Sequence, residues 1–333
     1  MSAPDKLLEV RGLRTVFHTR AGAVRAVDGL DLEVRRGECL GVVGESGSGK
    51  SVTFSSVMGL VRSPGLIEEG SILFEGRELT TLSPQEMRSL RGRDIAMTMQ
   101  DALTALNPAL TVGEQIGEVL DAHDETLPPG GRARTRAIRD RSVEMMGLVG
   151  IPSAGDRLRN YPHEFSGGMR QRIMIAIALA CRPKLLIADE PTTALDVTIQ
   201  AQVLELIADI RETLGMSVVL ITHDLGVVSE YCDRVMVMYA GQAVESGPTA
   251  QVIRDPQHPY TQGLLRSIPR VSLRGQRIQP IDGQVPELIG LGAECRFLSR
   301  CPRRRDACRR EISMRPFGEG RSARCVEIGE VPA

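Results

Sequence analysis

CLGVVGESGSGKS, residues 39–51, joins an apolar run to a glycine-rich loop that ends in Lys50 and Ser51. Residues 44–51 match G-x-x-x-x-G-K-[S/T] in full. Small residues let backbone N–H groups curl around phosphate groups, and the following helix N-terminus adds partial positive charge. We expect Lys50 to reach the β- and γ-phosphates of a nucleotide and the Ser51 hydroxyl to ligate Mg²⁺. The predicted nucleotide-binding residues are Gly44, Glu45, Ser46, Gly47, Ser48, Gly49, Lys50 and Ser51.

Strand-like and helix-like segments alternate on both sides of this loop. We expect strands over 7–16, 32–34, 38–43, 71–74, 94–99, 184–188, 216–221 and 234–239, and helices over 51–60 and 197–214. Between about 101 and 172 the strand-like runs vanish and helical periodicity dominates, apart from a Pro/Gly break at 127–131. This order predicts an α/β fold with a mostly parallel sheet and a helical insertion.

Composition narrows the class of protein. The 333 residues are 42% apolar and 25% charged, enough to build a substantial core. The net charge of −1 gives no overall attraction to nucleic acid, and 3% aromatic residues with no Trp argue against a base-stacking surface. We see no signal peptide at the N-terminus, and the longest apolar run, 173–181, is too short to span a bilayer. We therefore expect a soluble protein that reaches a membrane only through a partner.

A second motif combines an apolar strand with two carboxylates. Residues 185–190 read LLIADE, so that Asp189 and Glu190 follow a buried strand. Asp189 is suited to hold the Mg²⁺ shell, and Glu190 could polarise an attacking water as general base. Taken alone, the pair is explained at least as well by a solvated strand end.

Further segments resemble the ABC ATPases. Residues 165–171, FSGGMRQ, resemble the LSGGQ signature; His223 resembles the switch histidine; 194–196 resemble the D-loop with Asp196; and Gln100 resembles the Q-loop glutamine. The resemblance implies a P-loop NTPase core with an antiparallel β subdomain and a helical subdomain insertion. It also implies that Gln100, Glu190 and His223 act in ATP hydrolysis, with Gln100 joining Ser51 and Asp189 around Mg²⁺.

The signature has a physical basis of its own. Ser166 is a plausible N-cap for a helix running to about Cys181, and Gly167 and Gly168 would expose backbone N–H groups at its positive end. A chain with two separate phosphate sites needs a partner to complete each ATP pocket, and the resemblance implies a head-to-tail dimer. The usual adenine-stacking Tyr is missing; Phe17 is the nearest aromatic candidate, with His18 and simple strand packing as alternatives.

Three further segments indicate which group of ABC ATPases the chain resembles. Residues 99–108, 165–172 and 258–265, the last reading HPYTQGLL, resemble the oligopeptide/dipeptide permease ATPases, the dipeptide D-type chain above all. This resemblance implies an importer motor at the cytoplasmic face of the cell membrane, with a second related ATPase subunit, two permease subunits and an extracytoplasmic peptide-binding protein. The permease would dock near 107–118. Nickel or another small solute as cargo, and a non-transport ABC ATPase, are the alternatives.

Four of the seven cysteines lie close together in the sequence of the C-terminal region. Cys295, Cys301, Cys308 and Cys325 have the spacing C-x5-C-x6-C-x16-C, without the close pairs of structural zinc sites. Thiolate ligation without such pairs leaves an iron–sulfur cluster as a candidate, and the resemblance implies a [4Fe–4S] cluster here. Zinc or four free thiols are the alternatives. Ten arginines of this region, which we expect to offset the cluster's charge, are Arg296, Arg300, Arg303, Arg304, Arg305, Arg309, Arg310, Arg315, Arg321 and Arg324.

These observations predict three regions. The ATPase core takes 1–100 and 173–255, the helical signature subdomain takes 101–172, and a small Cys-rich C-terminal region takes 256–333.

Overall fold

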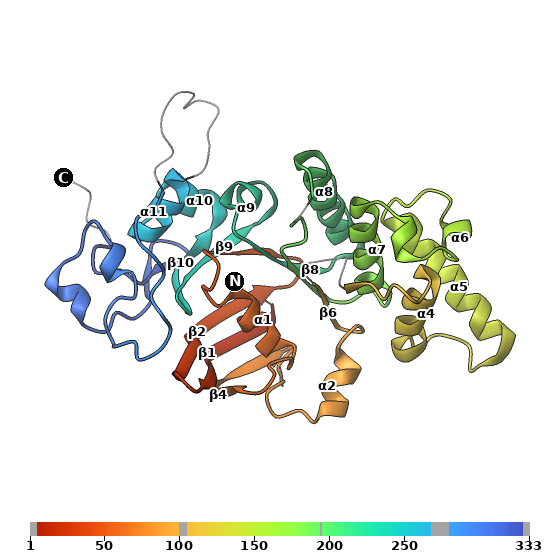
Figure 1. Cartoon of the computed structure of the whole chain (residues 1–333), viewed down its shortest axis with the longest axis horizontal. Coiled ribbons are helices and arrows are strands. Elements are labelled where there is room, and N and C mark those ends of the chain that lie inside the picture. The colour runs from red at the N-terminus through yellow and green to blue at the C-terminus, as the bar shows by residue number, and fades with distance from the viewer. Residues whose placement is uncertain (1–4, 100–104, 194, 268–279, 329–333) are drawn as a thin grey trace. The chain divides into compact units, whose positions relative to one another are not determined.

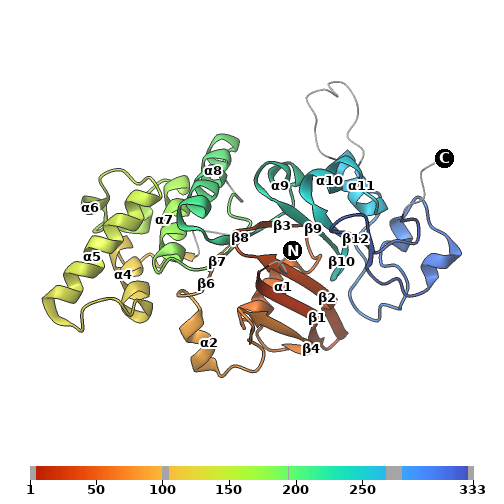
Figure 2. The ribbon, with the colours of Figure 1, turned by 180° about the vertical axis from the view of Figure 1, so that it is seen from behind.

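The computed structural model describes residues 5–99, 105–193, 195–267 and 280–328 (Figures 1 and 2). It divides into two compact units. The first unit is Met1–Thr81 with Leu220–Ala333, and the second unit is Leu82–Val219. The finer three-region division drawn from the sequence stays a prediction. No helix in the described part of the chain is both long and apolar enough to cross a bilayer.

The first unit contains a four-stranded antiparallel sheet in the order β2-β1-β4-β5 (Figure 1). Its strands are β1 Lys6–Thr19, β2 Gly22–Arg35, β4 Gly65–Phe74 and β5 Arg77–Glu78. Apolar side chains such as Leu8, Val10 and Leu13 are buried, while intervening positions are exposed or half-buried. This sheet confirms the expected antiparallel β subdomain.

A second set of strands in the first unit includes β3, which leads into the glycine-rich loop. The order is β11-β12-β10-β9-β3, with β3 Cys39–Val43, β9 Arg234–Tyr239, β10 Gln242–Pro248, β11 Arg315–Phe317 and β12 Arg321–Ala323. β3 and β9 are parallel, whereas β10, β11 and β12 are added antiparallel. Every residue of β3 is buried, as a strand covered on both faces requires.

Helices of the first unit pack beside these strands. They are α1 Lys50–Val57, α9 Leu225–Tyr231, α10 Thr249–Arg254 and α11 Pro259–Arg266. Gly41 of β3 allows close packing by α9, because a Cβ there would lie 2.6 Å from Val228 Cγ1. The C-terminal residues 280–328 add two short 3-10 turns, Leu298–Arg300 and Asp306–Arg309, and the β11–β12 hairpin.

The second unit is mainly helical (Figure 2). Its helices are α2 Pro84–Leu90, α4 Val112–His123, α5 Gly131–Leu148, α6 Ala154–Arg157, α7 Gly167–Leu179 and α8 Val197–Leu214, with the 3-10 turn Pro162–Glu164. The strands β6 Ile95–Thr98 and β7 Leu185–Asp189 pair in parallel. β8, Ser217–Thr222, runs across the chain position that divides the units. The expected helical insertion is therefore present.

Local sequence explains where these helices begin and end. Thr111 and Glu114 form a capping box at the start of α4. Asp196 caps α8, which ends at Leu214 as the sequence predicts, and the next residue, Gly215, is left-handed with φ 63°.

Candidate functional site

The loop at residues 44–51 joins β3 to α1 and lies tightly against neighbouring main chain. A Cβ at Gly44 would come within 2.2 Å of Met238 O. Gly49 has φ 99°, and a Cβ there would lie 2.4 Å from Ala26 O. A Cβ at Gly47, which has φ 77°, would meet nothing within 4 Å. The loop is thus a glycine-dependent cradle with an open side, a shape that fits phosphate groups.

Lys50 supplies the positive charge of this cradle. Its side chain is buried, and Nζ donates to Gly44 O at 2.7 Å, Glu45 O at 3.0 Å and Ser48 Oγ at 3.3 Å. Ser51 is exposed in the first turn of α1. The chain therefore places an ammonium group inside the loop and a hydroxyl beside it, which are the groups that the predicted phosphate and Mg²⁺ contacts require.

The two carboxylates differ in environment. Asp189 is the buried last residue of β7. Glu190 is half-buried and has φ 44°, a left-handed conformation that costs free energy for a residue other than glycine. Thr193 Oγ1 donates to Glu190 Oε2 at 2.9 Å. A solvated strand end needs no such strain, so this conformation favours a functional role for Glu190.

The signature segment begins α7 as the sequence predicts. Ser166 is the N-cap and its Oγ accepts from Met169 N at 3.4 Å. Gly167 and Gly168 form the first turn, and a Cβ at Gly168 would lie 2.7 Å from Ile199 Cγ2 of α8. Close contact with α8 therefore gives Gly168 a packing role in addition to its predicted contact with phosphate.

The unusual first residue of the signature, Phe165, has a structural explanation. Its ring is buried, and the Arg157 guanidinium lies 5.7 Å from the ring centroid. A cation above an aromatic face is attracted to it, so Phe165 anchors the entry into α7.

Asp196 and His223 lie at element boundaries. Asp196 Oδ1 accepts from Ile199 N at 2.9 Å and caps α8. His223 is exposed directly after β8, and Asp224 caps α9 by accepting from Gly226 N at 2.7 Å. The roles of Asp196 and His223 in ATP binding and hydrolysis stay predictions.

Two expected residues gain no support from the geometry. Phe17 is half-buried on β1 opposite Gly65 of β4, where a Cβ would come within 2.5 Å of its ring. Strand packing thus accounts for Phe17, and adenine stacking stays a prediction. Gln100 lies outside the described residues, together with 101–104 and 194.

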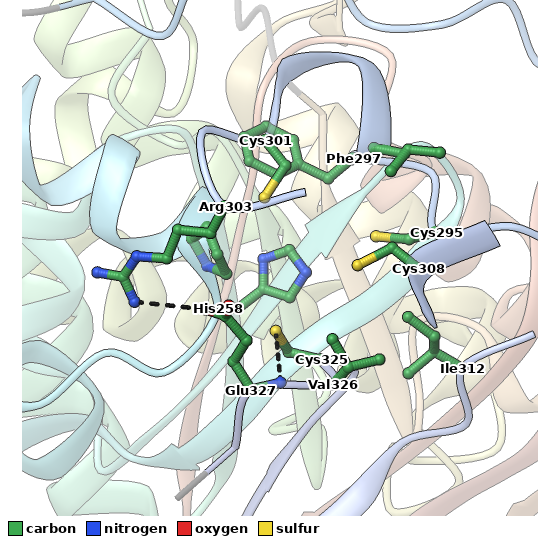
Figure 3. Close-up of a pocket in the computed structure, with 12 residues that line it drawn as sticks. His258, Cys295, Phe297, Cys301, Arg303, Cys308, Ile312, Cys325, Val326 and Glu327 are labelled. Atoms are coloured by element: carbon green, nitrogen blue, oxygen red, sulfur yellow. Dashed lines mark hydrogen bonds and ion pairs between the residues drawn. The ribbon is translucent and has the colours of Figure 1, made fainter. Parts of the chain in front are cut away.

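The expected metal site in the C-terminal region is contradicted. Cys295, Cys301, Cys308 and Cys325 line one small pocket with His258 (Figure 3). Its volume is about 10 Å³, room for about one water molecule. Across the parts of the chain that the structure describes, no group of three or more His, Cys, Asp or Glu side chains is placed to hold a metal ion. This finding corrects the expectation of a [4Fe–4S] cluster, and of zinc, at these cysteines.

The small volume of this pocket is the physical reason, and burial also affects the thiols that line it. Loss of solvent raises the pKa of the Cys295 thiol to about 11 and raises the pKa values of Cys301 and Cys325. Three of these four thiols are therefore harder to deprotonate in the metal-free chain than a free cysteine. All seven cysteines fall within the described residues, and none forms a disulfide.

Several arginines of this region have other partners than a cluster. Arg296 contacts Asp28 and Ala240 O, and Arg321 contacts Asp255. Arg300 binds the carboxylate of Glu45 in the glycine-rich loop. Sequence reasoning missed this last contact because the two residues are 255 positions apart and no local pattern marks the pair.

Family comparisons agree with this architecture. Residues 27–193 match the ABC transporter family, and residues 244–308 match the oligopeptide/dipeptide transporter C-terminal region. The chain is 51% identical to the dipeptide transport ATP-binding protein DppD of Bacillus subtilis, covering 92% of this chain and 90% of that protein. It is 47% identical to the oligopeptide transport ATP-binding protein OppD of Salmonella typhimurium, covering 96% and 93%.

Solved structures show the same fold. A dimeric ATP-binding cassette, MJ0796, bound to ADP and Pi matches with a TM-score of 0.64 and 24% identity, over 73% of this chain and 98% of that one. The cbiO1 protein of Clostridium perfringens matches with a TM-score of 0.62 and 27% identity, over 75% and 92%. With the glycine-rich cradle, the capped signature helix and the C-terminal region all in place, the chain belongs to the ABC transporter ATPases, in the group of peptide transport ATP-binding proteins.

Proposed function

We propose that this chain is the ATP-hydrolysing motor subunit of a binding-protein-dependent ABC importer for peptides. The observation that carries the proposal is the glycine-dependent cradle at 44–51, with the Lys50 ammonium held inside it. Similarity to the DppD and OppD proteins over most of the chain supports peptides as the cargo.

Within this function each site residue has a role. Lys50 and the loop N–H groups bind the phosphates, and Ser51, Asp189 and Gln100 offer oxygen ligands to Mg²⁺. When bound by these residues, Mg²⁺ would supply positive charge to neutralise the charge that develops on the phosphate oxygens. Glu190 accepts a proton from the attacking water, and His223 holds the γ-phosphate. Ser166, Gly167, Gly168 and Asp196 contribute to the ATP pocket of a neighbouring ATPase domain.

The assembly that we propose has a second, related ATPase chain, two permease subunits and an extracytoplasmic peptide-binding protein. The chain would lie at the cytoplasmic face of the cell membrane, held there by the permeases. Its own contribution to that contact is a groove of about 720 Å³ in the second unit, between α4 and α5. The groove includes Leu110, Thr111 and Glu114, in the segment for which permease docking is predicted.

The test is Glu190→Gln in the intact transporter. Removing the general base should lower ATP turnover by about 10²–10⁴-fold, while equilibrium binding of MgATP is retained. Glu212→Gln, an exposed carboxyl on α8, is the matched control and should keep full turnover. Unchanged hydrolysis in Glu190→Gln would remove Glu190 from the proposed mechanism.

A further inference from the structure

Glu45, the second residue of the glycine-rich loop, is held from two sides by residues far along the chain in the same unit. Its backbone N donates to Tyr260 Oη at 2.8 Å. Its carboxylate receives both terminal nitrogens of Arg300, with Nη1 to Oε2 at 2.6 Å and Nη2 to Oε1 at 3.0 Å. This is the bidentate geometry in which an arginine–carboxylate pair is strongest and most directional.

Arg300 is itself fixed in place. Its side chain is only 4% exposed. Nε donates to Asp282 O at 2.9 Å, and Nη2 also donates to Ile281 O at 3.1 Å. The guanidinium lies 5.7 Å from the Tyr239 ring centroid and 5.9 Å from that of Phe297. All three guanidinium nitrogens of Arg300 make hydrogen bonds, and its guanidinium group lies against two aromatic rings. Arg300 therefore has little freedom to follow Glu45 if the loop moves.

Tyr260 is equally constrained. It is fully buried, and its ring centroid lies 4.6 Å from that of Tyr239 and 5.4 Å from that of Phe297. Burial raises the pKa of Tyr260, so its hydroxyl stays neutral and can accept the Glu45 N–H. Tyr260 therefore offers a rigid hydrogen-bond acceptor to the loop backbone.

The same residue, Glu45, touches the phosphate-binding lysine. Its carbonyl oxygen accepts from Lys50 Nζ at 3.0 Å and from Ser48 N at 3.2 Å. Glu45 thus donates its N–H to Tyr260, while its carboxylate accepts from Arg300 and its C=O accepts from Lys50. Tyr260 fixes the Gly44–Glu45 peptide group, whose carbonyl oxygen, Gly44 O, also accepts from Lys50 Nζ at 2.7 Å, and Arg300 fixes the side chain of Glu45.

We propose that Arg300 and Tyr260 are positioning residues that clamp Glu45 and thereby hold the loop and Lys50 in the geometry that binds ATP. The inference rests on the proposed nucleotide site at 44–51. It assigns to the HPY segment, through Tyr260, and to the turn before Cys301, through Arg300, a direct effect on nucleotide affinity.

The experiment measures the KM for ATP, kcat and the thermal unfolding midpoint of the full chain in its transporter. Arg300→Lys keeps the positive charge but loses the bidentate contact with Glu45. Tyr260→Phe keeps the aromatic ring but loses the hydroxyl. Each should raise the KM for ATP about tenfold, the effect of losing one charge-assisted or backbone hydrogen bond at a preorganised site. Arg309→Lys, an exposed arginine of the same region, is the control and should leave KM unchanged.

A double-mutant cycle identifies the contact. If Arg300 acts through Glu45, the KM of the Arg300→Lys/Glu45→Gln double variant should be no higher than that of either single variant. Fully additive increases in KM would overturn the clamp. A merely structural role would lower the unfolding midpoint and kcat while the remaining active protein keeps its KM, and that result would also overturn it.

Lys50→Ala separates this inference from the proposed function. If the nucleotide site is right and the clamp wrong, Lys50→Ala weakens MgATP binding while Arg300→Lys and Tyr260→Phe do not. If the nucleotide site itself is wrong, Lys50→Ala also leaves MgATP binding intact.

Discussion

His258 shows how a single buried residue depends on its protonation state. It is 1% exposed, and its Nδ1 accepts from Tyr260 N at 3.1 Å, which caps the start of α11. Burial, with a contribution from Arg324, lowers the pKa of His258 to about 3. The folded protein therefore keeps a neutral imidazole that can accept this hydrogen bond across the physiological pH range.

Acidification should destabilise the fold through His258. Below the ordinary histidine pKa near 6.5 the unfolded chain binds a proton that the folded chain excludes, so stability falls as pH decreases toward about 3. Between pH 7 and pH 5 the loss is about 2 kcal/mol. His258→Asn keeps a capping oxygen without the titration, and denaturant unfolding at both pH values should show a smaller loss. Glu245, whose pKa burial raises, contributes with the opposite sign in both proteins. Equal losses in the two proteins would contradict the assignment.

At the scale of elements, two helices of the second unit meet through a glycine. Gly168 of α7 faces Ile199 of α8, where a Cβ would lie only 2.7 Å from Cγ2. The γ-carbon of a branched residue has little freedom to move away. The first turns of the signature helix and of α8 can therefore pack this closely only because residue 168 has no side chain.

Gly168→Ala should disturb this contact. Overpacking costs about 1–3 kcal/mol, so the unfolding midpoint and ATP turnover should both fall. Ile199→Ala removes the opposing carbon, and the Gly168→Ala/Ile199→Ala double variant should regain part of the lost stability. Gly147→Ala, on α5 with nothing within 4 Å of the added carbon, is the control and should be neutral or stabilising. If the double variant recovers no stability, the contact between residues 168 and 199 is not the cause of the destabilisation in Gly168→Ala.

Sequence patterns located the elements better than their ends. The run 39–51 predicted a buried strand, a loop and a helix because each depends on neighbouring residues, and Ser166 was identified as an N-cap for the same reason. β2 was expected only over 32–34 but begins at Gly22. Its pattern is broken at Gly29, which has φ 67° beside a register shift. β10 was not expected.

Contacts between distant segments could not be predicted from the sequence. The buried strand β10 pairs with β12, which follows some seventy residues later, and Arg300 reaches Glu45 from the far end of the chain. The cysteine spacing suggested metal ligands, but the folded chain packs these side chains around a pocket of only about 10 Å³. Burial and long-range pairing are properties of the folded chain, so spacing alone could not supply them.

At the scale of the whole molecule, the chain needs a surface that couples it to a membrane partner. The groove between α4 and α5 has apolar walls at Leu110, Ile138 and Leu158. Charged side chains, Glu114, Glu118, Asp121, Arg139 and Arg159, also line it. A groove lined by both apolar and charged side chains is typical of a site for an amphipathic helix, and this is the kind of segment that we expect a permease to present.

Leu110→Asp should therefore uncouple the motor from the permease without damaging the nucleotide site. A charge placed on the apolar wall opposes burial of the docked helix, and we expect about a tenfold loss of permease recovered with the affinity-tagged chain. Leu60→Asp, at an exposed leucine of the first unit, is the control and should leave recovery unchanged. MgATP binding by Leu110→Asp should match that of the unmodified chain, because Leu110 is not among the residues assigned to the nucleotide site. Normal recovery of permease with Leu110→Asp would exclude this groove as the docking surface and direct attention to another face of the second unit.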